Sequence, residues 1–236
     1  MTMLPLPPAN LRMNSASEKD DTVYLRSAKT LVAAIRSCLE VDRFSAVKRG
    51  VDKIQDMFLL DFGCGTSRLL HGLDDCGCAP KKYVGVDIQG PQIAWCTQYL
   101  SPAGDYHFQL IDAQNDRYNP GGKKAAGNLI DERFIGADLV VVRSVLTHMR
   151  AIEAYQTLSE LRRAVKDDGR VYLTVNVKNS SVPWTDKTDD REDGFNLLKV
   201  QFNKGYFENM LEEMGFTVAV FSASMENQCV YLLRPE

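Results

Sequence analysis

The chain has 236 residues, of which 44% are hydrophobic and 25% are charged, so it can bury the core of one large domain. Its 28 Lys and Arg residues against 31 Asp and Glu residues give a net charge of −3, which disfavours nucleic acid as a partner. No apolar run reaches the 18 residues of a membrane span, and residues 1–10 lack the pattern of a signal peptide. We therefore expect a cytoplasmic protein with no membrane span.

The predicted elements begin with a flexible N-terminal arm over residues 1–21, followed by a single domain over 22–236. Apolar residues at helical spacing predict a helix from about Thr22 to Leu39, with Asp20 and Asp21 placed to cap it. Short apolar runs then alternate with longer amphipathic stretches. The runs are Met57–Phe62, Tyr83–Val86, Phe108–Ile111, Ala137–Val142 and Val171–Val177, and the predicted helices lie around Ser67–Asp74, Pro91–Leu100 and Ala151–Lys166.

This alternation predicts an α/β fold. Apolar runs without polar alternation fit strands that are covered on both faces, and strands alternating with helices imply a parallel sheet. After the fifth run, a polar segment over 178–203 leads to a helix over about Lys204–Met214, which ends at Gly215. Two closely spaced strands follow, Phe216–Ser222 and Gln228–Leu233, and the short turn between them predicts an antiparallel pair.

Residues that directly follow the strands are the candidate ligand contacts, because ligands bind beyond the carboxyl ends of strands in an open α/β sheet. Gly63 and Gly65 follow the first strand and permit a tight turn with close backbone approach. Asp87 follows the second strand and suits a pair of ribose hydroxyls, and Asp112 follows the third and can accept from an adenine amino group. Each acid alone is also typical of turns and caps, but together they favour a nucleoside ligand. Arg68 stands in place of the third glycine of a dinucleotide fingerprint, which disfavours pyrophosphate.

Four motifs in this order resemble those of the class I S-adenosylmethionine-dependent methyltransferases. They are Phe58–Thr66, Tyr83–Ile88, Gln109–Ala113 and Val165–Leu173, and the resemblance covers roughly Met57 to Leu233. The resemblance implies a Rossmann-like three-layer sandwich, whose seven-stranded, mostly parallel sheet carries an antiparallel C-terminal strand. It also implies S-adenosyl-L-methionine as the cofactor. Ser67 departs from the pattern, because the family often has a third glycine there.

The same resemblance assigns residues to the cofactor. Ile88 could equally pack in the core, and a solvated helix face is the favoured place for Arg26, since exposed Arg is the norm. The implied cofactor-binding residues are Asp61, Gly63, Cys64 and Gly65 for the methionine part, Asp87 for the ribose, Ile88, Asp112 and Ala113 for the adenine, Arg143 and Ser144 on the side of the acceptor, and Arg26 for the carboxylate.

His148 is the candidate catalytic base. By the resemblance, the stretch Arg143–Met149 lines the space between cofactor and acceptor, and His148 lies in it at a strand end. An imidazole with a pKa near 6.5 can take the proton of a hydroxyl during in-line methyl transfer. The alternative is that His148 caps the following helix or supports the pocket. Thr147, its neighbour, is a candidate substrate-binding residue.

Two insertions, about 115–134 and 178–203, are the candidate substrate-side elements. The string Arg117–Gly122, together with Ser144–Met149, resembles small methyltransferases of bacterial or viral glycan assembly, although it also fits an ordinary Pro-Gly turn. The second insertion places Trp184 among carboxylates, a combination that can grip a sugar, hold a divalent metal or simply be solvated. The candidate acceptor contacts in the two insertions are Tyr118 and Trp184.

We therefore expect an O-methyltransferase that acts on a hydroxyl of a sugar, in a glycan or a nucleotide-sugar. The alternatives are a small natural-product or metabolite hydroxyl or amine as acceptor, and a non-catalytic module that only binds the cofactor. RNA and protein acceptors rank third, because the acidic balance disfavours RNA. The six cysteines lack the paired spacing of a zinc site, so we expect no metal ligands, and the sequence leaves the oligomeric state open.

Overall fold

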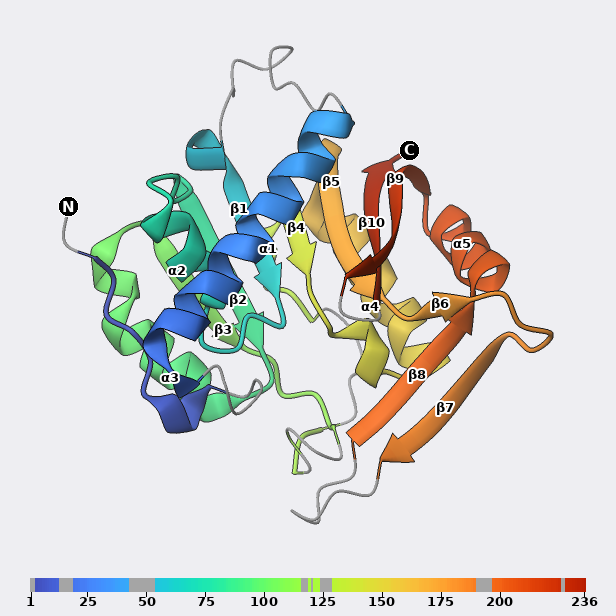
Figure 1. The fold of residues 1–236 in the computed structure, drawn as a ribbon, viewed down its shortest axis with the longest axis horizontal. Helices are drawn as coiled ribbons and strands as arrows, with labels where there is room; N and C mark the ends of the chain where they lie inside the picture. The colour runs from blue at the N-terminus through green and yellow to red at the C-terminus, as the bar shows by residue number, and fades with distance from the viewer. Residues whose placement is uncertain are drawn as a thin grey trace. The chain divides into compact units, whose positions relative to one another are not determined.

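The computed structural model describes residues 3–12, 19–42, 54–115, 119, 121–123, 129–189, 197–225 and 228–236. They fall into two compact units, residues 1–111 and residues 112–236 (Figure 1). No helix in the described part of the chain combines the length and the hydropathy needed to cross a membrane.

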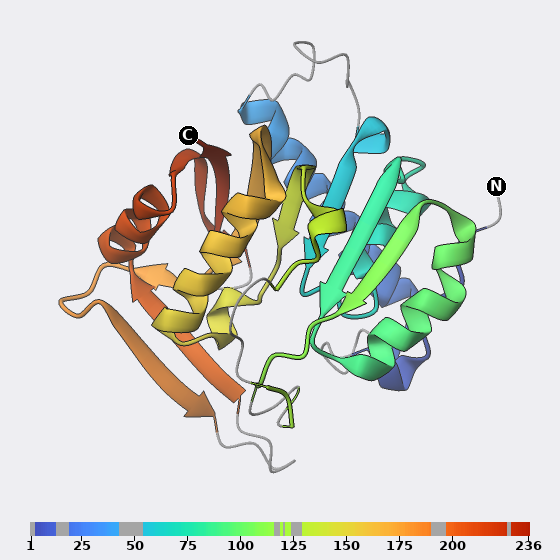
Figure 2. The same cartoon turned by 180° about the vertical axis from the view of Figure 1, so that it is seen from behind.

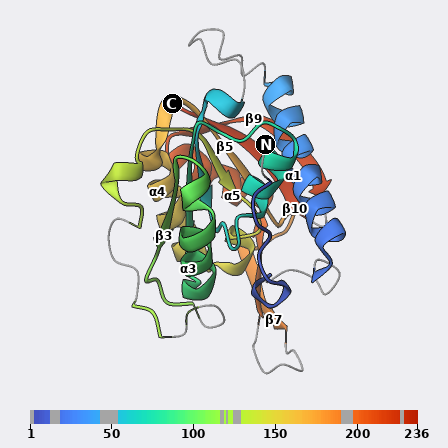
Figure 3. The same cartoon turned by 90° about the vertical axis from the view of Figure 1, so that its left-hand side faces the viewer.

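The described residues of the first unit form three parallel strands in the order β3-β2-β1, and three α-helices. Helix α1 lies beside α2 in Figure 1, and α3 lies beside β3 in Figure 3. The strands are β1 (Phe58–Phe62), β2 (Lys82–Asp87) and β3 (Tyr106–Leu110), and the helices are α1 (Asp21–Val41), α2 (Arg68–Asp75) and α3 (Gly90–Tyr99).

Local sequence signals set the ends of α1 and α2 and the distance between these helices. The Asp20 side chain caps α1 by accepting from the Val23 amide at 3.0 Å, as the sequence predicts. The helices α1 and α2 cross closely at Gly72, where a Cβ atom would lie 2.7 Å from the Ala28 carbonyl oxygen. Gly77, with a φ of 65°, ends α2 in the left-handed conformation that glycine adopts without strain.

Residues 3–12 pack against the helices of the first unit, where we expected part of a flexible arm. Leu4 is buried, and its backbone N–H donates to Oδ2 of Asp74 at 3.1 Å. Arg12 is buried as well, with its guanidinium 4.6 Å from the centre of the Tyr24 ring. Apolar burial and cation–π contact thus hold this part of the segment in place.

The second unit holds four strands in the order β4-β5-β10-β9, in which β10 is antiparallel to both of its neighbours. Figure 2 shows α4 lying along β4 and β5. A second, three-stranded sheet has the order β6-β8-β7. The elements are β4 (Ala137–Val142), α4 (Ala151–Ala164), β5 (Val165–Val175), β6 (Val177–Lys178), β7 (Trp184–Asp189), β8 (Leu197–Asn203), α5 (Lys204–Glu213), β9 (Phe216–Met225) and β10 (Gln228–Pro235).

The strand order of the main sheet is β3-β2-β1-β4-β5-β10-β9, which confirms the predicted seven-stranded, mostly parallel sheet with one antiparallel strand near the C-terminus. Strands β7 and β8 were not predicted, because 178–203 was described only as a polar segment and a substrate-side insertion. The signal that was missed is the alternation in β8, where Val200 and Phe202 are buried and the residues beside them are not. The single domain over 22–236 stays a prediction.

Candidate functional site

The turn between β1 and α2 has the backbone that a close ligand contact requires. Gly63 and Gly65 have φ values of 80° and 54°, a region that glycine enters without a Cβ penalty. The amides of Gly63 and Cys64 donate to the Val86 carbonyl at 2.8 and 3.1 Å, which ties the turn to β2. A Cβ atom added to Gly65 would meet no atom within 4 Å. The Cα of Gly65 therefore faces open space, as a cradle for a ligand would.

Ser67 shares the left-handed backbone of this turn, with a φ of 60°. It is fully buried, and its Oγ lies 3.5 Å from Sγ of Cys96. The resemblance places a glycine at this position in many relatives, and the observed φ explains that preference. The serine therefore changes the residue but keeps the conformation of the turn.

Asp87 closes the turn from the end of β2. Its Oδ2 accepts from the Gly65 amide at 2.7 Å, and its Oδ1 accepts from the Gln89 amide at 3.0 Å. Burial raises the pKa of Asp87 above its ordinary value, against the effect of these amide donors. A carboxylate oxygen can accept two hydrogen bonds, so Asp87 can also accept from ribose hydroxyls.

Asp61 lies on β1, two residues before Gly63. It is 5% exposed, and the Tyr83 hydroxyl donates to its Oδ2 at 2.6 Å. Burial raises the pKa of Asp61 to about 7, the Tyr83 hydrogen bond lowers it, and the charge of Asp87 raises it. A cationic group such as an ammonium would favour the charged form of this buried carboxyl group.

The remaining predicted residues of the first unit differ in exposure. Cys64 is buried, and burial raises the pKa of its thiol well above the ordinary value, so it is a neutral packing residue. Ile88 is half-buried, and Arg26 is exposed on α1. Arg68, which sequence reasoning did not assign to the site, begins α2 and is close enough to Asp61 for its charge to lower that carboxyl's pKa.

Asp112 and Ala113 open the second unit. Asp112 is exposed, with Oδ2 3.7 Å from Nζ of Lys123, and an exposed pair of this kind contributes little stability. The Ala113 carbonyl accepts from Nδ2 of Asn119 at 3.1 Å. Asp61 and Asp87 therefore share one unit and Asp112 lies in the other, so the assignment of all three acids to one cofactor stays a prediction. Tyr118 lies outside the described residues.

His148 ends a short 3₁₀ helix, η6 (Leu146–His148), that follows β4. Its Nδ1 lies 2.7 Å from the carbonyl oxygen of Leu198 on β8. A carbonyl only accepts, so the contact assigns the proton to Nδ1 and makes Nε2 the nitrogen that can accept one in the neutral ring. Thr147 is 1% exposed, and its Oγ1 has no hydrogen-bond partner among the described residues.

Trp184 lies on β7 and is 41% exposed, with its ring 5.6 Å from that of Tyr206. It pairs with Phe202, four residues along β8 from the Leu198 that contacts His148. At about 3.3 Å per residue, this separation along the strand is roughly 13 Å. A contact with Trp184 therefore suits an acceptor longer than one small group.

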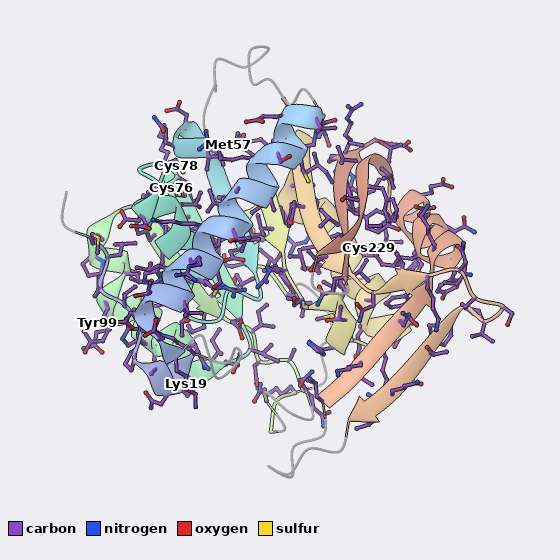
Figure 4. All side chains as sticks on the ribbon, in the orientation of Figure 1. Lys19, Met57, Cys76, Cys78, Tyr99 and Cys229 are labelled. Atoms are coloured by element: carbon purple, nitrogen blue, oxygen red, sulfur yellow. The ribbon has the colours of Figure 1, made fainter. Side chains whose placement is uncertain are left out.

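The cysteines show no sign of a shared role. All six are free of disulfide bonds, and Cys76 and Cys78 follow the end of α2 (Figure 4). Across the described ranges, no group of three or more His, Cys, Asp or Glu side chains is placed to hold a metal ion.

Comparison with known proteins agrees with this geometry. Residues 36–220, well over half of the chain, match a family model described as a methyltransferase domain. An S-adenosylmethionine-dependent methyltransferase from Clostridium acetobutylicum is 13% identical, with a TM-score of 0.55, over 86% of this chain and 89% of that one. Magnesium protoporphyrin IX methyltransferase from Synechocystis with bound SAH is 16% identical, with a TM-score of 0.55, over 95% and 89%. The CcbJ methyltransferase from Streptomyces caelestis is 14% identical, with a TM-score of 0.52, over 76% and 83%.

Proposed function

Because the chain belongs to the methyltransferase domain family, we propose that it transfers the methyl group of S-adenosylmethionine to a hydroxyl oxygen of a sugar. The observation that carries the acceptor chemistry is the contact between His148 Nδ1 and the Leu198 carbonyl at 2.7 Å. It leaves Nε2 as the basic nitrogen, and a hydroxyl acceptor has a proton to lose as its oxygen bonds to carbon.

The glycine turn and its acids fit the cofactor. S-adenosylmethionine, when bound, supplies an electrophilic methyl carbon whose bond to sulfur breaks as the acceptor oxygen takes it. Asp61 would hold the ammonium group, which a buried carboxylate favours, and Asp87 would hold the ribose hydroxyls. The open Cα of Gly65 allows the backbone to approach the cofactor closely.

Residues of the second unit would bind and activate the acceptor. Nε2 of His148 takes the hydroxyl proton, while the Leu198 carbonyl holds the opposite side of the ring. Oγ1 of Thr147 has no hydrogen-bond partner in the described part of the chain, which supports a polar acceptor, because a ligand hydrogen bond would recover the stability that an unsatisfied buried hydroxyl costs. The exposed ring of Trp184 supports a sugar, whose apolar face stacks on aromatic side chains.

Substitution of His148 tests the proposal. We expect His148→Ala to lower the rate of S-adenosylhomocysteine formation, with pooled methyl glycosides and nucleotide-sugars as acceptors, by roughly 10²- to 10⁴-fold. His148→Asn offers an amide donor to Leu198 without supplying a base, and should lose as much. Affinity for S-adenosylhomocysteine, measured by calorimetry, should change little. His107→Ala, at an exposed histidine paired with Asp105, is the matched control. Undiminished turnover in both His148 variants would remove the base, and no transfer to any sugar would remove the acceptor class.

A further inference from the structure

Ser144 adopts an unusual backbone at the start of the segment that leads to His148. It directly follows Arg143 at the end of β4 and has a φ of 57°. Serine pays a penalty in this left-handed region, because its Cβ crowds the following carbonyl. Something must therefore stabilise this conformation, since it directs the chain from β4 toward η6.

A closed set of hydrogen bonds around Ser144 supplies that stabilisation. The Ser144 amide donates to Oγ1 of Thr174 at 2.9 Å, and this hydroxyl donates to Oε1 of Gln228 at 2.6 Å. Nε2 of Gln228 lies 3.1 Å from Oγ of Ser144, which is also 3.2 Å from Oε1. Thr174 has one hydroxyl proton, so giving it to Gln228 orients its lone pairs toward the Ser144 amide.

The topology explains why a residue 84 positions later in the chain reaches Ser144. Strand β10 runs antiparallel to β5, with Val230 opposite Thr174. Residues two apart on a strand share a face, so Gln228 lies on the same face as Thr174, at the end of β5. The antiparallel strand therefore begins at the edge of the sheet where β4 ends, two residues before Ser144.

From this network we propose that Gln228 is a positioning residue for the segment 144–148. It holds Ser144 in the left-handed conformation through Thr174, and thereby sets where Thr147 and His148 lie. The effect of Gln228 on catalysis rests on the proposed function, whereas its effect on the conformation of 144–148 does not. Gln228 contacts Ser144 and Thr174, so its effect on Thr147 and His148 passes through the backbone of Ser144.

A double-mutant cycle between Gln228 and Ser144 tests this coupling. Glycine has no left-handed penalty, so Ser144→Gly removes the need for the network. We expect Gln228→Leu to speed hydrogen–deuterium exchange of the amides of 144–149, in the protein without acceptor, by roughly five- to thirty-fold. In the presence of Ser144→Gly, the same change should speed exchange by no more than about twofold. Gln156→Leu, at an exposed glutamine on α4, is the matched control and should leave this exchange unchanged.

A turnover measurement adds the catalytic consequence. We expect Gln228→Leu to lower kcat by a similar factor, with little change in affinity for S-adenosylhomocysteine, and Ser144→Gly to reduce that loss. A merely structural role would lower thermal stability and would act equally in both backgrounds. Equal effects in both backgrounds, or no change in exchange with Gln228→Leu, would overturn the proposal. If the wild-type protein transfers methyl groups to no sugar, the proposed function fails, while exchange still decides the role of Gln228.

Discussion

The pKa of Asp61 predicts that this residue makes the protein without cofactor less stable as pH rises. Burial raises the pKa from an unfolded value of 3.8 to about 7, so the folded protein holds a proton that the unfolded chain releases. Between about pH 4 and pH 7 the folded state therefore loses stability with each pH unit. At about 1.4 kcal/mol per unit, the full effect above pH 7 is about 4 kcal/mol.

Asp61→Asn removes the titration and keeps the size of the side chain. Relative to wild type, we expect the variant to gain about 3 kcal/mol more stability at pH 8 than at pH 5, because about two pH units of the window lie between pH 5 and pH 7. Urea unfolding of both proteins at the two pH values, without cofactor, measures this difference. The variant should also bind S-adenosylhomocysteine more weakly, since it loses the charge that would hold the ammonium group.

Tyr83→Phe removes the hydroxyl that donates to the Asp61 carboxyl group. The Tyr83 hydroxyl lowers the pKa of Asp61, so its loss should raise that pKa and extend the fall in stability to higher pH. A difference between Asp61→Asn and wild type that is the same at pH 5 and pH 8 would refute the raised pKa.

Two further substitutions test the turn and the acceptor side. Ser67→Gly should be more stable than Ser67→Ala by about 1 kcal/mol, because the φ of 60° is unfavourable for every residue with a Cβ. Thermal unfolding of both variants measures this difference, and equal stability would contradict the prediction. Thr147→Val should leave stability unchanged or raise it by up to about 1 kcal/mol, because it removes a buried hydroxyl that has no partner among the described residues. It should also raise the KM for a sugar acceptor, and an unchanged KM would remove Thr147 from the acceptor site.

The main sheet and the glycine turn after β1 were predictable because their signals are local. A strand such as Ala137–Val142 is apolar along its whole length, and the structure gives β4 the same bounds. The glycines that follow β1 indicated a turn, and both have positive φ values. The Asp20 cap likewise depends on residues three positions apart. Where the residues that determine an element lie within it or next to it in the chain, their types were sufficient to predict it.

The packing of residues 3–12 and the sheet formed by β7 and β8 depend instead on distant contacts. Polar composition indicated a flexible arm over residues 1–21 and no strand within 178–203, but Leu4 and Arg12 are buried against helices. In β8, Val200 and Phe202 alternate with polar residues, a pattern too short to outweigh the charges around it. Burial of a few apolar side chains stabilises the structure of both segments. An average composition does not show the effect of so few residues.

The partner of His148 shows a stricter limit of sequence reasoning. The residue that fixes its ring is 50 positions away and acts through a backbone carbonyl, which every amino acid at position 198 would offer. No residue type could therefore have indicated the contact, although the sequence did make His148 a candidate. Gln228 differs, because its side chain makes the contacts with Ser144 and Thr174. A substitution at Leu198 should consequently affect His148 only if it shifts the backbone of β8. A substitution at Gln228 should affect Ser144 directly, because it removes the side-chain amide.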